Sequence, residues 1–137
     1  MPIDLTDYAE AINSALPEFT FCVLATCGDD GPDVGFKGSM QVFDNEHLCY
    51  WERTRGGHLT NLRSDPRAAV MYFSRERGKY LRMYGRAELH EDGPIREQIM
   101  AKTPSPELEK DPDRQGIGVL IRVDRLVEPF GGVSQQR

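Results

Sequence analysis

The stretch VLATCGDDGPDVGFKGSMQVF, residues 23–43, decides the fold. It continues a run from Phe19 to Thr26 that is rich in aromatic and β-branched residues, which is typical of a buried strand. The GDDGP cluster at 28–32 is a turn signal. From Asp33 to Phe43, apolar residues alternate with small or polar ones, which predicts one continuous second strand. The stretch therefore predicts an antiparallel hairpin.

Turn signals divide the rest of the chain into further short elements. Clusters such as DNE at 44–46 and ERGK at 76–79 separate runs that have the composition or the alternation of strands. Short helices are predicted after Asp4, His58 and Asp92. The proline-rich, charged residues 102–115 read as a surface segment, and residues 128–137 as a tail. The further predicted strands are 47–53, 67–74, 80–89 and 116–127.

The pattern as a whole predicts a mainly β protein. The 137 residues suit a single domain, 1–137, and show no internal repeat and no alternation of strands with helices. Hairpin spacing favours six antiparallel strands with about three short helices, closed into a barrel because closure removes exposed sheet edges.

Composition and charge exclude several classes of function. The chain has 17 Lys and Arg against 22 Asp and Glu, a net charge of −5, whereas non-specific nucleic-acid binding needs a basic surface. The apolar runs are too short for a membrane span, and the acidic start MPIDLTDYAEAI lacks the pattern of a signal peptide, which favours the cytoplasm. Three cysteines, without metal-ligand spacing, predict neither a disulfide framework nor a metal site.

The segment from Arg53 to Leu62 is the first candidate site. It combines a strand end, the pair Gly56 and Gly57, and a helix start. First-turn amides of a helix have no partner within the helix and favour an anion, and glycines allow close approach. Nearby cationic and polar side chains would add donors to a phosphate. An ordinary capped turn with solvated arginines is the alternative interpretation.

A second candidate is the sequence Lys37-Gly38-Ser39 within the predicted second strand. A glycine inside a strand costs stability and often marks the close approach of a ligand or of another backbone. A strand with one solvated face explains the same residues equally well. Trp51, on the neighbouring strand, is an ordinary packing residue or the wall of a site for a flat ring.

No catalytic constellation is visible in the sequence. His47, His58 and His90 lie at turns or at the ends of elements, and the chain lacks GxSxG, GxGxxG and P-loop motifs. The catalytic residues are therefore unknown. An enzyme built this way would need a cofactor to carry the chemistry.

Taken together, residues 23–72 and YLRMYGRAELHEDGP at 80–94 resemble the pyridoxamine 5'-phosphate oxidase-like family of FMN-binding split barrels. The chain is also similar to the small bacterial FMN-binding proteins of that superfamily. The markers are the LAT strand with its DG turn, the KGS sequence, the NLR and DPR helix end, and the GRAE strand. Their order and spacing extend over roughly residues 19–127.

The resemblance implies a six-stranded Greek-key split barrel that forms a homodimer with FMN in a groove at the dimer interface. By position, it implies that one set of residues follows the isoalloxazine ring and ribityl chain, partly through backbone, and that another set surrounds the phosphate. The first set is Lys37, Gly38, Ser39, Trp51 and Glu52, and the second is Arg53, Thr54, Gly57 and His58.

Two departures from the family pattern shape the expected function. Many members carry a basic pair where this chain has Gly57 and His58, and Arg53 and Arg55 are the residues that could compensate. The tail EPFGGVSQQR lacks the Arg- and Trp-containing segment of the true oxidase, so oxidation of pyridoxamine phosphate is not expected. We expect an FMN-dependent oxidoreductase acting on a small substrate or redox partner. The alternatives are a non-catalytic flavin-binding or electron-carrier protein, and the same fold with a deazaflavin or haem.

Overall fold

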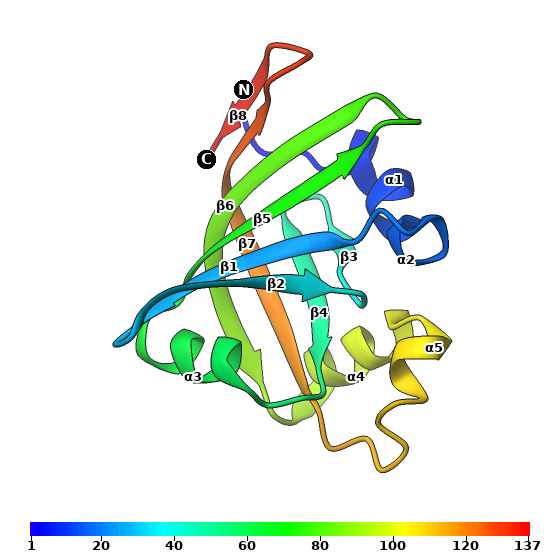
Figure 1. The fold of residues 1–137 in the computed structure, drawn as a ribbon, viewed down its shortest axis with the longest axis vertical. Helices are drawn as coiled ribbons and strands as arrows, with labels where there is room; N and C mark the ends of the chain where they lie inside the picture. The colour runs from blue at the N-terminus through cyan, green and yellow to red at the C-terminus, as the bar shows by residue number, and fades with distance from the viewer.

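The computed structural model describes residues 1–137. One antiparallel sheet, in the strand order β2-β1-β5-β6-β7-β4-β3 with β8 added to β7, curls into a barrel (Figure 1). The mainly β split-barrel class is therefore confirmed. The strands are β1 (Cys22–Gly28), β2 (Gly31–Lys37), β3 (Gln41–Asp44), β4 (His47–Glu52), β5 (Arg67–Ser74), β6 (Lys79–His90), β7 (Ile117–Glu128) and β8 (Val133–Gln136).

Short helices surround the barrel. The chain begins with η1 (Thr6–Tyr8), α1 (Ala9–Asn13) and α2 (Ala15–Glu18), which break the predicted single helix into three pieces. Apolar residues of this segment are buried, among them Leu5 and Ile12. The other helices are α3 (Gly57–Ser64), which contacts β1, α4 (Gly93–Lys102), which contacts β7 and β4, and α5 (Ser105–Leu108). None of the helices has the length and hydropathy needed to span a bilayer.

The predicted strand from Asp33 to Phe43 is wrong, because the chain breaks at Gly38 and forms two strands, β2 and β3. These two strands are the opposite edges of the sheet and do not pair with each other. At the break, Gly38 leaves room for the carboxylate of Glu107 from α5, which lies where a Cβ would stand. The barrel is split at this point.

The end of the chain is also not a tail. It forms the strand β8, which pairs with β7 through Arg125 to Glu128, so the sheet has eight strands and not the six predicted. Buried Gln135 closes this end of the molecule, because its side chain accepts a hydrogen bond from the amide of Asp4 at 2.9 Å and donates one to the carbonyl of Asp4 at 3.2 Å.

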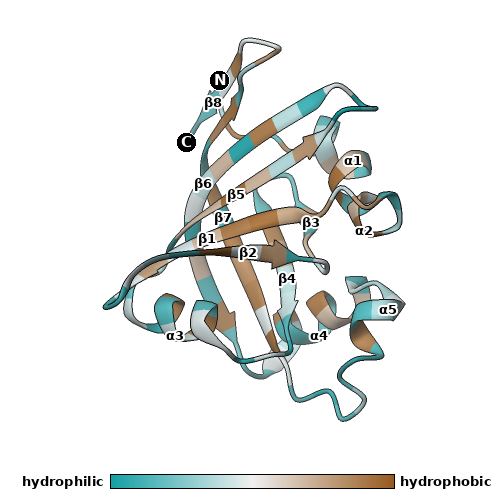
Figure 2. Cartoon of the chain, viewed as in Figure 1, coloured by the Kyte–Doolittle hydropathy of each residue, from teal (hydrophilic) through white to brown (hydrophobic).

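The core occupies the inside of the barrel, where alternate residues of the strands point. Predicted inward positions of β6, such as Leu81 and Met83, are fully buried. Strand β4 is buried on both faces: Leu48 and Tyr50 face the main core, whereas Cys49 and Trp51 belong to a second, smaller core under α4. Figure 2 shows hydrophobic residues along β1 and β7 and hydrophilic residues at the β1–β2 turn. The double burial of β4 holds the split edge of the barrel in place.

Candidate functional site

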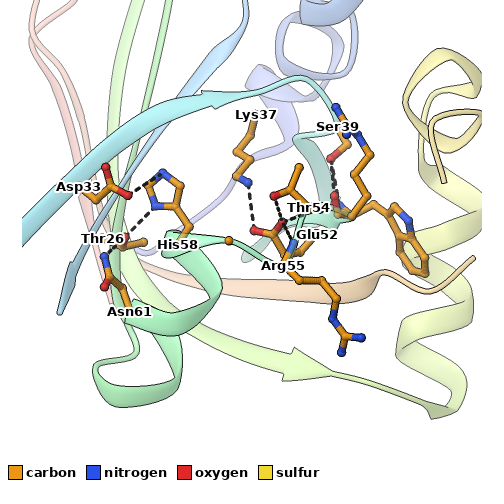
Figure 3. Close-up of polar contacts among 12 residues, drawn as sticks. Thr26, Asp33, Lys37, Ser39, Glu52, Thr54, Arg55, His58 and Asn61 are labelled. Atoms are coloured by element: carbon orange, nitrogen blue, oxygen red, sulfur yellow. Dashed lines mark hydrogen bonds and ion pairs between the residues drawn. The ribbon is translucent and has the colours of Figure 1, made fainter. Parts of the chain in front are cut away.

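The split brings the end of β2 next to the end of β4, and a buried ion pair joins them. Lys37 Nζ lies 3.0 Å from Glu52 Oε1 (Figure 3). Only 1% of the Glu52 side chain is exposed. Its second oxygen accepts hydrogen bonds from the amide of Thr54 at 3.2 Å, from the hydroxyl of Thr54 at 2.9 Å and from the amide of Arg55 at 3.2 Å.

These contacts keep Glu52 ionised and shape the turn that follows β4. Burial by itself raises the pKa of this carboxyl, but the charge of Lys37 and the hydrogen bonds from Lys37, Thr54 and Arg55 outweigh burial and lower the pKa below its usual value. Arg55 takes a left-handed conformation with φ 54°, which is rare for a residue other than glycine. The turn from Arg53 to Gly56 is thus folded around one buried carboxylate.

Ser39 holds the other side of the split. Its hydroxyl accepts a hydrogen bond from the amide of Trp51 at 3.0 Å and donates to the carbonyl of Trp51 at 3.3 Å. Gly38, next to it, provides the close approach that its position suggested, although the group that approaches is the side chain of Glu107. The predicted Lys37-Gly38-Ser39 sequence therefore forms the hinge between the two sheet edges.

The side chain of Trp51 points away from Lys37, into the smaller core. Its indole Nε1 donates to Asp111 Oδ2 at 2.9 Å, and the guanidinium of Arg96 lies 4.8 Å from the ring centroid. The residue is 3% exposed and packs against Gly116. Trp51 is a packing residue here, and a ligand at the split could contact Trp51 and Glu52 mainly through their backbone.

The start of α3 is open to an anion. Its cap residue, Gly56, supplies no side-chain hydrogen bond, so the first amides of the helix are free. The nearby guanidinium groups are weakly held: Arg53 Nε lies 3.7 Å from Glu107 Oε2, and Arg55 Nη2 lies 3.7 Å from Glu91 Oε1. Amides without partners, two glycines and two partly exposed arginines are thus close together in the sequence at the start of α3. These residues fit a phosphate group.

His58, in the first turn of α3, is a neutral donor in this arrangement. Its Nδ1 lies 2.7 Å from the hydroxyl of Thr26, which also accepts a hydrogen bond from the side-chain Nδ2 of Asn61 at 3.1 Å. Burial and the charge of Lys37 lower the pKa of His58, so the ring is uncharged at pH 7. Because Thr26 can donate to Nδ1, the arrangement favours the ring hydrogen on Nε2, which lies 4.0 Å from Asp33 Oδ2.

The sequence missed the acidic side chains that border the site. Asp33 lies beside Gly57, with its carboxylate 3.2 Å from the place of a Cβ on that glycine. Glu107 reaches Gly38 from the segment read only as a surface excursion, and one of its oxygens is buried without a hydrogen-bond partner. The sequence of this segment carries no signal of the contact with Gly38. Among the predicted residues, the structure clusters Lys37, Glu52, Thr54, Arg53 and His58 around the split, as well as Gly57.

Comparisons with known proteins show the family and the fold of the chain. The family profile for pyridoxamine 5'-phosphate oxidase matches residues 8–123, so the chain belongs to this family. A search of curated proteins finds no significant match.

Solved structures show the same fold. A protein of Lactobacillus delbrueckii provisionally named a pyridoxamine 5'-phosphate oxidase is 29% identical, with a TM-score of 0.68 over 90% of this chain and 93% of that one. An FMN-binding protein of Syntrophomonas wolfei is 9% identical, with a TM-score of 0.69 over 90% and 86%. An F420 reductase is 18% identical, with a TM-score of 0.59 over 79% and 89%.

Proposed function

We propose that this chain binds FMN at the split of the barrel. The observation that carries the proposal is the uncapped start of α3 with Gly56 and Gly57. It directly follows Arg53 and Arg55, whose partly exposed side chains make only 3.7 Å ion pairs, at the end of the strand that Lys37 contacts. The family match to pyridoxamine 5'-phosphate oxidase and the FMN-binding neighbour support the choice of flavin.

In this proposal the protein binds two ends of one ligand. The phosphate meets the amides of Gly57 and His58, with Arg53 and Thr54 as side-chain donors. The ring and ribityl chain follow Lys37, Gly38 and Ser39, and contact Trp51 and Glu52 through backbone. When bound, FMN supplies hydride or electron transfer, and the residues of the chain bind and orient it.

We infer that the protein is an oxidoreductase of a small substrate other than pyridoxamine phosphate. A deazaflavin is the alternative cofactor, because an F420 reductase shares the fold. A non-catalytic carrier would use the same site without turnover.

Flavin titration tests the proposal. Added FMN should lose its fluorescence on binding and saturate at one molecule per chain, and riboflavin, which lacks the phosphate, should bind more weakly. Reduction of bound FMN by NAD(P)H with turnover would separate an enzyme from a carrier. If FMN fluorescence is not quenched and F420 binds tightly, the cofactor is the deazaflavin and not FMN. If neither FMN nor F420 binds, the cofactor assignment is wrong.

Replacing Asp33 with asparagine should strengthen FMN binding. The carboxylate of Asp33 lies beside Gly57, where it would repel a phosphate, whereas an amide removes the charge and keeps the shape. We expect FMN affinity to rise about three- to tenfold, as the loss of one like charge a few ångströms away implies. Riboflavin affinity should stay the same. Asp30→Asn, in the turn of the same hairpin, is the matched control. Unchanged FMN affinity in Asp33→Asn would mean that the phosphate binds elsewhere.

We further propose that two chains associate through the outer face of β2, β1 and β5. Four large apolar side chains project from this face into solvent: Val34 is 66% exposed, Phe36 72%, Met71 38% and Phe73 48%. The strand register places Phe36, Val23 and Met71 in one row across the three strands. Large exposed apolar patches mark association surfaces, and a C2 dimer is the commonest closed form.

Light scattering tests this assembly. The wild-type protein should have twice the 15.5 kDa mass of the chain. Phe36→Glu should shift it to the monomer mass, because a buried, unpaired charge at an interface is costly. Ala101→Glu, on an exposed position of α4, should leave the dimer intact. A monomeric wild-type protein at micromolar concentration would contradict the dimer.

A further inference from the structure

Glu107, on α5, is a nearly buried carboxylate that lacks a hydrogen bond on one oxygen. Its side chain is 13% exposed, and Oε2 is buried without a hydrogen-bond partner. Two cationic atoms lie near Oε2, Lys110 Nζ at 3.4 Å and Arg53 Nε at 3.7 Å, both beyond the distance of a good hydrogen bond. A buried acceptor without a hydrogen bond costs free energy. This oxygen therefore interacts with its two cationic neighbours through charge alone.

The segment that carries Glu107 is fastened to the barrel. Asp111, four residues after Glu107, accepts a hydrogen bond on Oδ2 from Trp51 Nε1 of β4 at 2.9 Å. The guanidinium of Arg114 donates to the carbonyl of Leu108, the last residue of α5, at 3.0 Å. These bonds fix the backbone on either side of the turn that follows α5. Glu107 is therefore a carboxylate on a rigid support.

Arg53 has a fixed backbone and a loosely held guanidinium. It directly follows Glu52, whose carboxylate accepts hydrogen bonds from the amides of Thr54 and Arg55 and so holds the turn in place. The guanidinium of Arg53 makes no hydrogen bond, and its one ion pair is the 3.7 Å contact with Glu107. The side chain is 33% exposed, so solvent weakens this pair. Turning Arg53 away from Glu107 therefore breaks a single weak contact.

We propose that Glu107 competes with the flavin phosphate for Arg53 and thereby sets how strongly the site prefers FMN to riboflavin. This role rests on the proposed function, in which Arg53 donates to the phosphate. The guanidinium lies beside Glu107 when the site is empty and turns to a bound phosphate, because paired hydrogen bonds to an oxyanion are stronger than a 3.7 Å ion pair. Lys110 then stays beside Oε2, so the buried carboxylate keeps a counter-charge. Glu107 is a positioning residue, which acts on the ligand only through Arg53.

Fluorescence titration of Glu107→Gln with FMN and with riboflavin tests this role. The amide keeps the shape of the side chain and removes its charge, so Arg53 turns to the phosphate without breaking an ion pair. FMN affinity should rise about three- to fivefold, as the loss of one partly exposed ion pair implies, and riboflavin affinity should stay the same. Lys110→Met should weaken FMN binding alone, because Arg53 is then the one counter-charge of Glu107. Glu109→Gln, which removes an exposed carboxylate of the same segment, is the matched control.

A double-variant cycle separates competition for Arg53 from direct repulsion of the phosphate. In the Arg53→Ala background, Glu107→Gln should change FMN affinity less than about twofold, because the guanidinium for which Glu107 competes is absent. The same gain in both backgrounds would mean that Glu107 repels the phosphate directly, and the proposal would be wrong. A loss of FMN affinity in Glu107→Gln would also overturn it, because the ion pair would then orient Arg53 for the ligand.

The same measurements distinguish the failure of this role from the failure of the proposed function. A wild-type protein that binds no FMN would contradict both. If the wild type binds FMN more tightly than riboflavin and Glu107→Gln keeps the same ratio of the two affinities, only the role of Glu107 is wrong. Urea unfolding checks that the variants fold. Glu107→Gln should be at least as stable as the wild type, because it removes the charge from a buried oxygen that has no hydrogen bond.

Discussion

Replacing Lys37 with methionine is expected to lower the free energy of unfolding by about 2–4 kcal/mol at pH 7, because it leaves the carboxylate of Glu52 buried without its counter-charge. The loss of stability should be smaller than for a buried charge without any partner, because Glu52 keeps three hydrogen bonds. Urea unfolding measures the change. Arg77→Met removes a more exposed pair with Glu18 and should cost under about 1 kcal/mol.

The pH dependence of this variant identifies the cause. The lowered pKa of Glu52 stabilises the wild type above the ordinary carboxyl range, and this stability is lost as the pH falls through the folded-state pKa. Without Lys37, burial dominates and the pKa of Glu52 rises. The difference in stability between the wild type and Lys37→Met should therefore narrow as the pH falls from the ordinary carboxyl range through the lowered folded-state pKa of Glu52. The wild type then loses this stabilisation, whereas in the variant protonation relieves the buried charge.

A double variant separates charge from packing. Lys37→Met with Glu52→Gln has no buried charge, so it should regain much of the lost stability. A Lys37→Met protein that is as stable as the wild type at pH 7, with the same acid profile, would show that the pair contributes nothing.

Replacing Arg53 with alanine is expected to weaken FMN binding about ten- to a hundredfold and to leave riboflavin binding unchanged. The loss corresponds to one charge-assisted contact, about 1.5–3 kcal/mol. Riboflavin has no phosphate and so has no contact to lose. The stability of the protein should change little, because the only ion pair lost is the 3.7 Å contact of Arg53 with Glu107. Fluorescence titration with both ligands measures the difference.

Arg75→Ala is the control for this measurement, because its side chain is exposed in a turn and makes no ion pair. Equal losses of affinity for FMN and riboflavin in Arg53→Ala would show that the phosphate does not bind at the start of α3. The fold assignment would be unaffected. Unchanged affinity for both ligands would mean that Arg53 is only a surface residue.

Local signals were sufficient to predict the strands but not their connection at Gly38. The alternation from Asp33 to Phe43 is continuous in sequence, and period-two alternation cannot show that the chain leaves one sheet edge and begins the other. The break coincides with two contacts: Gly38 lies against Glu107, about seventy residues further along, and Ser39 bonds to the backbone of Trp51. Both are contacts between distant segments.

The cationic residues and glycines of the candidate site could be proposed from the sequence, but its acidic residues could not. Arg53 and Gly57 could be proposed because an arginine or a glycine just before a helix is typical of a phosphate site. The buried pairing of Lys37 with Glu52 needs two strand ends to meet across the split, which no local pattern records. Trp51 allowed two interpretations from the sequence, and its side chain is a packing residue of the smaller core, because β4 is buried on both sides.

The two edge strands β2 and β3 do not pair with each other, and this affects how the molecule moves. Only the three residues Gly38 to Met40 connect them, and the ties across the gap are side-chain contacts, whereas the other strands share backbone ladders. The gap can therefore open by a local fluctuation while the ladder of β5, β6 and β7 stays closed. A ligand at the split would enter and leave through such openings, so its exchange rate would reflect the local stability of this edge and not that of the whole barrel.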